Sequence, residues 1–203
     1  MTNDIQTLKD DIAYLKALAD SGQGKSLGGG IILMAAGLLY ASASVVQWMA
    51  MAHVGTVGGA ASNLAWIIAT LVFMAVLMAV KLRWRAEGWG SNSASVAWKG
   101  VGIGCFFIFA ALALATWRSQ SALLIEFAPS IVFILYGAAW IAMGTALRLN
   151  WVQVTGWASF AGALITAWFI GQASSYLIYA AGLIVLAFLP GLIFALQAQR
   201  AGA

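Results

Sequence analysis

The chain has 203 residues, of which 63% are hydrophobic and 8% are charged, and its formal net charge is +4. Its mean hydropathy is +0.93. A soluble domain of this length needs much more charge on its surface, so the composition excludes a soluble globular protein and predicts an integral membrane protein.

The apolar residues are concentrated in six runs of about 20 residues, the length that crosses a hydrocarbon core of roughly 30 Å as a helix. The runs are residues 27–50, 63–82, 100–117, 128–147, 151–171 and 175–197. They are rich in Leu, Ala, Met and Gly and lack ten-residue alternating segments, which favours helices over a β-barrel. We therefore expect an all-α integral membrane protein with six transmembrane helices in a compact bundle over residues 27–200. Because the connections are short, consecutive helices should be antiparallel neighbours.

The polar segment before the first run, residues 1–26, is predicted to form a cytoplasmic amphipathic helix and a spacer. Apolar residues recur along it at spacings of three and four: Ile5, Leu8, Ile12, Leu15 and Ala19. A helix that binds anionic lipid carries excess base on its polar face, whereas residues 3–21 contain more Asp than Lys. Beside the lipid bilayer around the spans, we expect docking onto the bundle, self-association or a protein partner through residues 3–21.

The start of the chain carries a distinctive pattern. An acidic pair with "DIAYLKALA", a short Gly/Ser spacer and the glycine-rich opening "SLGGGIILMAAG" follow one another within the first 45 residues. In these features the chain resembles a family of uncharacterised bacterial six-span inner-membrane proteins with an N-terminal DD-[IL]-A-[YF] amphipathic helix. The resemblance implies six spans and a bacterial plasma membrane, and it implies no activity and no catalytic residue.

Met49, Met51 and His53, at the outer end of the first run, are ligand types that suit Cu(I). On a helix Met49 and His53 share a face while Met51 points away, so the three converge only if the helix has already ended. An ordinary interfacial histidine is the favoured interpretation, and copper, or haem bound by His53, is the alternative. We expect no metal and no other cofactor.

Small residues in the third and fifth runs have the spacing of close helix contacts. Gly100 and Gly104 are four residues apart, and so are Ala158 and Gly162. Such pairs let two membrane helices approach closely. The single cysteine, Cys105, lies inside the third run and has no partner for an intrachain disulfide.

Glu126 lies in the otherwise apolar stretch "SALLIEFAPSIVF", three residues before Pro129. If the fourth helix begins with Pro129, residues 129–147 already span about 28 Å, and Glu126 lies outside the hydrocarbon core, where Arg118 could pair with it. If the helix begins at Ala122 instead, Glu126 lies about one turn deep and faces the bundle as a candidate proton or cation site. The interfacial interpretation is favoured, and both remain open.

Pro190 and Gly191 interrupt the sixth run toward its cytoplasmic end. Proline has no N–H, so Pro190 frees the carbonyl of Leu186, and we expect a kink there. A purely structural kink is the favoured interpretation. A hinge for gating, or a substrate cradle, formed at Pro190 and Gly191 is the alternative.

Lys and Arg are distributed unevenly between the two sides of the predicted bundle. Nine fall on the side of the N-terminus: Lys9, Lys16, Lys25, Lys81, Arg83, Arg85, Lys99, Arg148 and Arg200. Only Arg118 falls on the other side. The positive-inside rule therefore places both termini in the cytoplasm, and the net charge reflects topology rather than nucleic-acid binding.

Two further patterns concern the ends of the runs. Six tryptophans fall at or near these ends, as interfacial anchors do: Trp48, Trp66, Trp84, Trp98, Trp117 and Trp151. The motif "AVKLRW" ends the second run, "ALRLNW" ends the fourth, and "ALQAQ" ends the sixth. The repetition suggests three tandem helical hairpins, although every cytoplasmic helix end favours a base and a Trp by itself.

The intramembrane positions offer at most one carboxylate, Glu126, with one cysteine and no histidine pair, so we do not expect an enzyme. The predicted function is that of a non-catalytic multi-pass membrane protein, an accessory or regulatory partner of a membrane complex. The alternative is a small transporter or channel for an ion or a small apolar solute, suggested by the hairpins, Glu126 and the Pro190 break. A solute pathway normally needs polar groups along it, and few are present.

Overall fold

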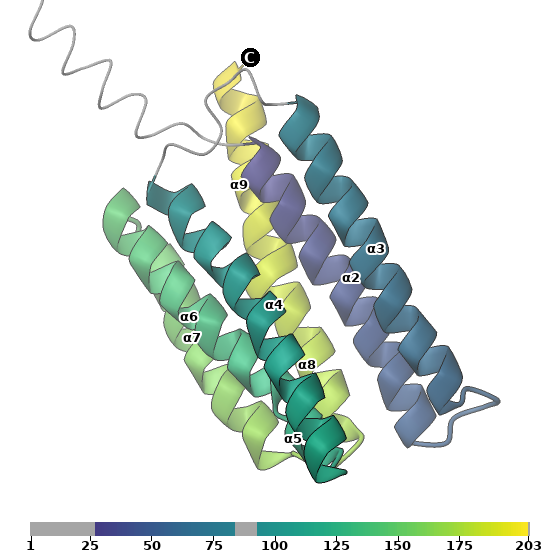
Figure 1. Ribbon diagram of the computed structural model, residues 1–203. Coiled ribbons are helices and arrows are strands. Elements are labelled where there is room, and N and C mark those ends of the chain that lie inside the picture. The colour runs from purple at the N-terminus through teal and green to yellow at the C-terminus, as the bar shows by residue number, and fades with distance from the viewer. Residues whose placement is uncertain (1–26, 84–92, 203) are drawn as a thin grey trace, which may run out of the picture.

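The computed structural model describes residues 27–83 and 93–202, and the amphipathic helix predicted over residues 3–21 lies outside these ranges. In chain order the elements are α2 (Leu27–Met51), α3 (Gly59–Arg83), α4 (Ser93–Ser119), α5 (Leu123–Glu126), α6 (Ala128–Leu147), α7 (Asn150–Trp168), α8 (Ser174–Leu183), the π-helical turn η2 (Ile184–Phe188) and α9 (Leu189–Gly202). The long helices run side by side along one common direction (Figure 1). No strand occurs in the described ranges, so the all-α prediction is confirmed.

Five helical segments of the described chain are long and apolar enough to cross a membrane. They are Leu27–Met51, Gly59–Arg83, Ala97–Ser119, Leu123–Leu147 and Ser174–Arg200. The predicted fifth run also forms a helix, α7, but α7 is not among the five. Its first two turns contain Asn150, Gln153 and Thr155, which lower its hydropathy. The described chain is therefore helical, with several segments suited to crossing a membrane, as in a multi-pass membrane protein. The count of six spans stays a prediction.

Helix α2 lies at the centre of the packing. It contacts α3 on one side and α8, η2 and α9 on another, while α6 packs against both α7 and α4. The chain closes on itself because its last membrane-length segment, α8 to α9, lies along its first, as Figure 1 shows. Helices α3 and α4 follow one another in the chain, yet α3 packs chiefly on α2 and α4 chiefly on α6.

The core lies between α6, α7 and the α8–η2 segment. The side chains of Phe133, Trp140 and Leu183 are fully buried there. The ring of Phe133 lies 5.0 Å from that of Tyr179, centre to centre, and Trp140 stacks on Phe194 at 6.2 Å. Lipid tails are as apolar as these side chains, so close packing and hydrogen bonds, rather than escape from water, hold such helices together.

The glycine-rich opening of α2 is explained by its contact with η2 and α9. A Cβ added at Gly30 would lie 2.7 Å from the carbonyl oxygen of Gly191, and one added at Gly37 would lie 2.6 Å from the amide nitrogen of Phe188. Real Cβ atoms do not approach backbone so closely, and only glycine fits at both positions. Because Gly30 and Gly37 are seven residues apart, they lie on one face of α2, which is the face that receives η2 and α9.

In each small-residue pair chosen from the sequence, one member meets a neighbouring helix and the other does not. A Cβ at Gly162 would lie 3.2 Å from the ring of Phe133, and one at Gly104 would lie 3.6 Å from Leu135. A Cβ at Gly100 would meet nothing within 4 Å, and Ala158 is exposed. The closest backbone approach between α6 and α7 involves Gly137 and Gly156, since a Cβ at Gly156 would lie 3.0 Å from the carbonyl oxygen of Gly137. For Gly100 and Ala158 the prediction of close packing is therefore wrong within the described chain, because spacing alone does not tell which face of a helix meets a neighbour.

Two of the predicted tryptophan anchors have partners inside the bundle. Helix α3 begins at Gly59 rather than residue 63, which leaves Trp66 two turns from its start. The indole Nε1 of Trp66 donates to Gln47 Oε1 at 3.3 Å. Trp98 lies edge-on to Trp140, with ring centres 4.8 Å apart. Both tryptophans therefore join helices to one another, which interfacial anchoring alone did not predict.

Candidate functional site

The break in the last long helical segment coincides with the predicted position. The π-helical turn η2 ends at Phe188, two residues before Pro190, and the amide of Leu189 donates to the carbonyl of Ile184, five residues back. The carbonyl of Leu186, which Pro190 leaves without its helical donor, accepts a hydrogen bond of 2.9 Å from Trp140 Nε1. Trp140 is fully buried and Leu186 is 6% exposed, so without this bond the carbonyl would be an unsatisfied polar group inside the core.

The candidate hinge residues Pro190 and Gly191 are enclosed on the α2 side. Gly191 faces Gly30 at backbone contact, and Phe188 faces Gly37. Together with the Trp140 bond, these contacts fix the break from two neighbouring helices. Movement at the break would have to disrupt them, which favours the structural interpretation of the kink. The role of a hinge stays a hypothesis.

Glu126 is the only acidic residue in the described ranges. It is the last residue of α5, and α6 starts two residues later with Pro129 in its first turn, as one sequence interpretation required. The carboxylate is partly buried and points toward the turn after α7: Glu126 Oε2 lies 4.0 Å from the position of a Cβ at Gly171. Gly171 has φ +80°, a left-handed conformation that glycine adopts readily.

The suggested partner of Glu126 lies elsewhere. Arg118 is exposed in the last turn of α4, and within the described residues it forms no ion pair with Glu126. The helix start agrees in part with both sequence interpretations. Pro129 lies in the first turn of α6, as the interfacial interpretation required, and the helical turn α5 begins at Leu123, close to the start that the other interpretation required.

Three buried hydroxyls lie where α6, α7 and α8 meet. Ser130 Oγ lies 3.0 Å from Thr166 Oγ1, and Thr166 Oγ1 donates within its own helix to the carbonyls of Gly162 and Ala163. A hydroxyl has one hydrogen, so Ser130 is the donor of the pair. Ser175 Oγ donates to the carbonyl of Thr166 at 3.5 Å. These hydroxyls satisfy one another and the backbone, so they join three helices without leaving a free ligand group.

The candidate metal ligands do not converge. Met49 and Met51 both lie within α2, which ends at Met51, and residues two apart on a helix do not face each other. His53 is exposed in the following turn at φ +55°, a conformation for which His is enriched. The described residues also contain no cluster of three or more His, Cys, Asp or Glu side chains that could hold a metal ion.

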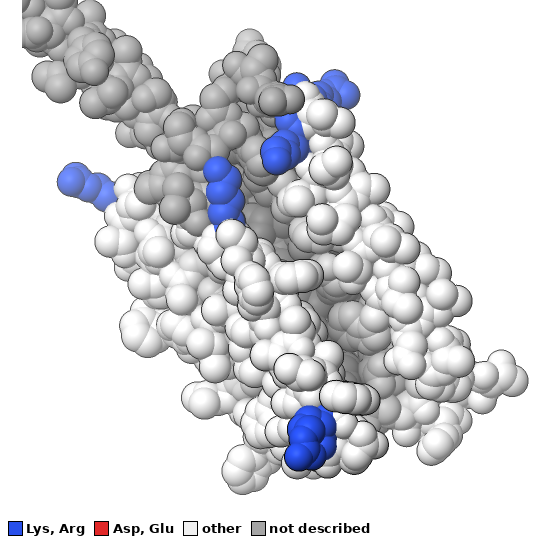
Figure 2. All heavy atoms as spheres, viewed as in Figure 1, with Lys and Arg blue, Asp and Glu red and all other residues white. Residues whose placement is uncertain are grey.

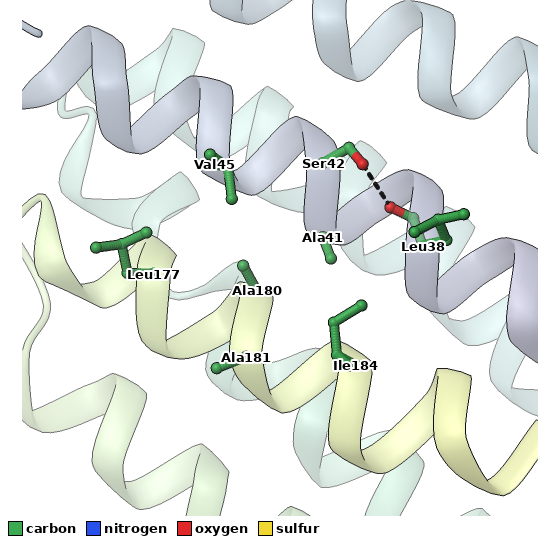
Figure 3. A pocket seen from close by; sticks show the side chains of 8 residues that line it. All are labelled: Leu38, Ala41, Ser42, Val45, Leu177, Ala180, Ala181 and Ile184. Atoms are coloured by element: carbon green, nitrogen blue, oxygen red, sulfur yellow. Dashed lines mark hydrogen bonds between the residues drawn. The ribbon is translucent and has the colours of Figure 1, made fainter.

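A groove that sequence reasoning missed lies between residues 38–45 of α2 and residues 177–184 of α8 and η2, and we call it the α2–α8 groove (Figure 3). Its volume is about 400 Å³. Ala41 and Ala180 are buried at its floor, while Leu38 and Leu177 are exposed at its rim. The sequence signal for this groove is the pair of small residues Ala41 and Ala180 on facing helices. Which helices face each other is known only from the structure.

The outer faces of α3 and α4 are the least covered surfaces of the described bundle. In the most apolar stretch of α4, none of the residues is buried inside the described bundle. The buried share of the corresponding stretch is 11% in α3 and 50% in the segment Leu123–Leu147. Large apolar side chains point outward from both helices, among them Leu64, Ile67 and Leu71 on α3 and Ile103, Phe106 and Phe107 on α4. In Figure 2 the wall between α4 and α3 is recessed along its length.

Charge is confined to the two ends of the bundle. Figure 2 shows Lys and Arg side chains at both ends and an uncharged wall between them. Lys81 and Arg83 end α3, Lys99 lies near the start of α4, and Arg200 is in α9, all at the end where α2 begins. Arg118 ends α4 at the opposite end.

None of the family models, curated proteins or solved structures compared with the chain matches it. The function must therefore be argued from the residues and the geometry of this chain alone.

Proposed function

We propose that this protein is a non-catalytic multi-pass membrane protein that acts as an accessory or regulatory partner of a membrane complex. The observation that carries the proposal is the position of α3 and α4. Each lies along one helix of the bundle and presents its other faces, rich in Leu, Ile and Phe, over its whole length. Two helices held in this way offer long surfaces to the transmembrane helices of a partner.

The described interior supports a binding role better than transport. Phe133, Trp140 and Leu183 fill the middle of the α6–α8 core, and the hydroxyls of Ser130 and Thr166 bond to each other outside that layer. A solute pathway requires polar groups or water along its course. The polar groups of this core are instead used to join helices.

The proposed topology has six spans with both termini in the cytoplasm. Helix α7 has 19 residues, so it extends about 28 Å and can cross a hydrocarbon core despite its polar first turns. The five described bases at one end of the bundle, against Arg118 at the other, support this orientation. The resemblance of the first 45 residues supports a bacterial inner membrane, and the Asp-rich segment 3–21 supports a protein contact on the cytoplasmic side.

Site-specific cross-linking tests the proposal. A photoreactive phenylalanine analogue replaces Phe106 or Phe107 on α4, or Leu71 on α3, and the protein is irradiated in its own membranes. Matched controls carry the analogue at Trp157 or Leu164, which are equally exposed on α7. We expect a discrete protein adduct from α4 or α3 and lipid adducts alone from α7. Lipid adducts alone from all positions would contradict the proposal.

A small transporter or channel is the second candidate, and Glu126 is the observation that favours it. A partly buried carboxylate without an ionic partner among the described residues, one helical turn before Ser130, is the kind of group that binds a proton or a cation. This candidate predicts that Glu126→Gln changes the rate or the pH dependence of proton or cation flux into proteoliposomes. An unchanged flux removes Glu126 from consideration as an ion site.

A further inference from the structure

The α2–α8 groove lies at membrane depth. Both of its walls belong to segments long and apolar enough to cross a membrane, Leu27–Met51 and Ser174–Arg200. Leu177 is the fourth residue of α8, so the groove begins about 5 Å from the Arg118 end of that helix and runs inward for about 10 Å. Its surroundings are therefore hydrocarbon, within the leaflet on that side.

The lining of the groove selects an apolar occupant. Apart from Ser42, its lining side chains are those of Ala, Val, Leu and Ile. The Ser42 hydroxyl already donates to the carbonyl of Leu38 at 2.9 Å, as the dashed line in Figure 3 shows. The groove thus offers no free donor to a polar or charged ligand.

The size of the groove selects a narrow occupant. A helix with its side chains is about 10–12 Å wide, so a segment about 10 Å long occupies on the order of 800 Å³. The groove holds about 400 Å³, so it admits the side chains of one helix ridge but not the full width of a helix. The groove is present because the side chains of Ala41 and Ala180, which lie between the two helices, are too small to fill it. A single hydrocarbon chain matches the apolar lining and fits within the volume.

We propose that the α2–α8 groove binds one acyl chain of a membrane lipid from the leaflet at the Arg118 end of the bundle. The site lies on α2 and α8, away from the surfaces of α3 and α4 that we assign to a partner. It rests on the membrane placement of the chain and is independent of the accessory role.

A lipid cross-linking experiment tests the site. The full-length protein is placed in nanodiscs that contain a phosphatidylcholine with a diazirine in the middle of one acyl chain, irradiated and mapped by peptide mass spectrometry. We expect labelling of residues 38–45 and 177–184 in excess of residues 103–110 on the exposed face of α4. Equal labelling of both surfaces would show ordinary lipid contact only and would overturn the proposal.

Filling the groove provides the decisive control. The double variant Ser42→Leu and Ala181→Leu adds volume at two exposed lining positions, and the double variant Ala110→Leu and Ala113→Leu adds the same kind of volume on exposed α4 positions. Only the first should abolish the excess labelling, with unchanged helical circular dichroism in both variants. Excess labelling that survives filling, or a cross-link between two copies at these residues, would overturn the acyl-chain assignment. Neither result would bear on the accessory function.

Discussion

At the scale of single residues, the structure shows how one buried polar group is satisfied in an apolar core. Pro190 deprives the Leu186 carbonyl of its helical donor, and Trp140 supplies the missing hydrogen from a neighbouring helix. A buried carbonyl left unsatisfied costs about 1–3 kcal/mol. The stability effects of Trp140 and Pro190 should therefore depend on each other, because one residue supplies the donor that the other removes.

This dependence predicts the outcome of a double-mutant cycle. Trp140→Phe keeps an aromatic ring but removes the hydrogen-bond donor. It should lower the free energy of unfolding by about 1–3 kcal/mol. Pro190→Ala restores a backbone N–H four residues after Leu186. In that background the loss caused by Trp140→Phe should be smaller by about 1 kcal/mol. Reversible unfolding in mixed micelles measures both, and equal losses in the two backgrounds would show that the hydrogen bond contributes nothing.

At the scale of elements, glycines on different helices have opposite roles. Gly37 on α2 lies against the backbone of Phe188, whereas Gly100 on α4 faces open space. The first glycine is required by a close helix contact. The second lowers the intrinsic stability of its helix without bringing it closer to a neighbour in the described chain.

The two glycines should therefore respond differently to the same change. Gly37→Ala forces η2 and α2 apart and should lower the free energy of unfolding by about 1–3 kcal/mol. Gly100→Ala removes backbone freedom at no steric cost and should leave stability unchanged or raise it by about 0.5–1 kcal/mol. Thermal midpoints in one detergent compare the pair directly. A loss at Gly100 as large as that at Gly37 would mean that α4 is packed more tightly than its exposure indicates.

Much of the element scale could be predicted from the sequence. The apolar runs gave the positions of the long helices, Pro129 marked the first turn of α6, and Pro190 marked the carbonyl of Leu186 as the one without its usual donor. What hydropathy does not encode is which face of an apolar helix meets another helix and which meets lipid, because both environments are apolar.

For this reason four features became visible only in three dimensions. They are the donor from Trp140 to Leu186, the placement of Glu126 against Gly171, the open surroundings of Gly100, and the groove floored by Ala41 and Ala180. Each depends on which helices are neighbours. The sequence located the residues, and the packing determined what they face.

At the scale of the whole molecule, the bundle consists of a closed core and two outlying helices. Helix α2 packs on α8, η2 and α9, while α7 packs on both α8 and α6 around the buried aromatic residues. Helix α3 packs chiefly on α2, and α4 chiefly on α6. The bases lie at the ends and the wall between them is uncharged (Figure 2). This distribution is compatible with a multi-pass membrane chain, and we propose that the exposed apolar faces of α3 and α4 contact a partner.

The six-span topology predicts where each end of α7 can be reached. In a Cys105→Ser background, Gln172→Cys and the outer control Gln120→Cys should react with a membrane-impermeant maleimide in intact cells. Asn150→Cys should react only after the membrane is opened, because α7 would place it on the cytoplasmic side. Protection of both Asn150→Cys and Gln172→Cys in intact cells, with Gln120→Cys still reactive, would mean that α7 does not cross and that the chain has five spans.

The accessory role is tested most directly by the native mass of the complex extracted gently from its own membranes, with and without residues 1–26. We expect a second protein to accompany the full-length chain through the α3 and α4 surfaces and the N-terminal segment, and truncation to lower the measured mass by loss of that protein. A chain that runs at its own mass, or as a multiple of itself, in both forms would contradict the central claim.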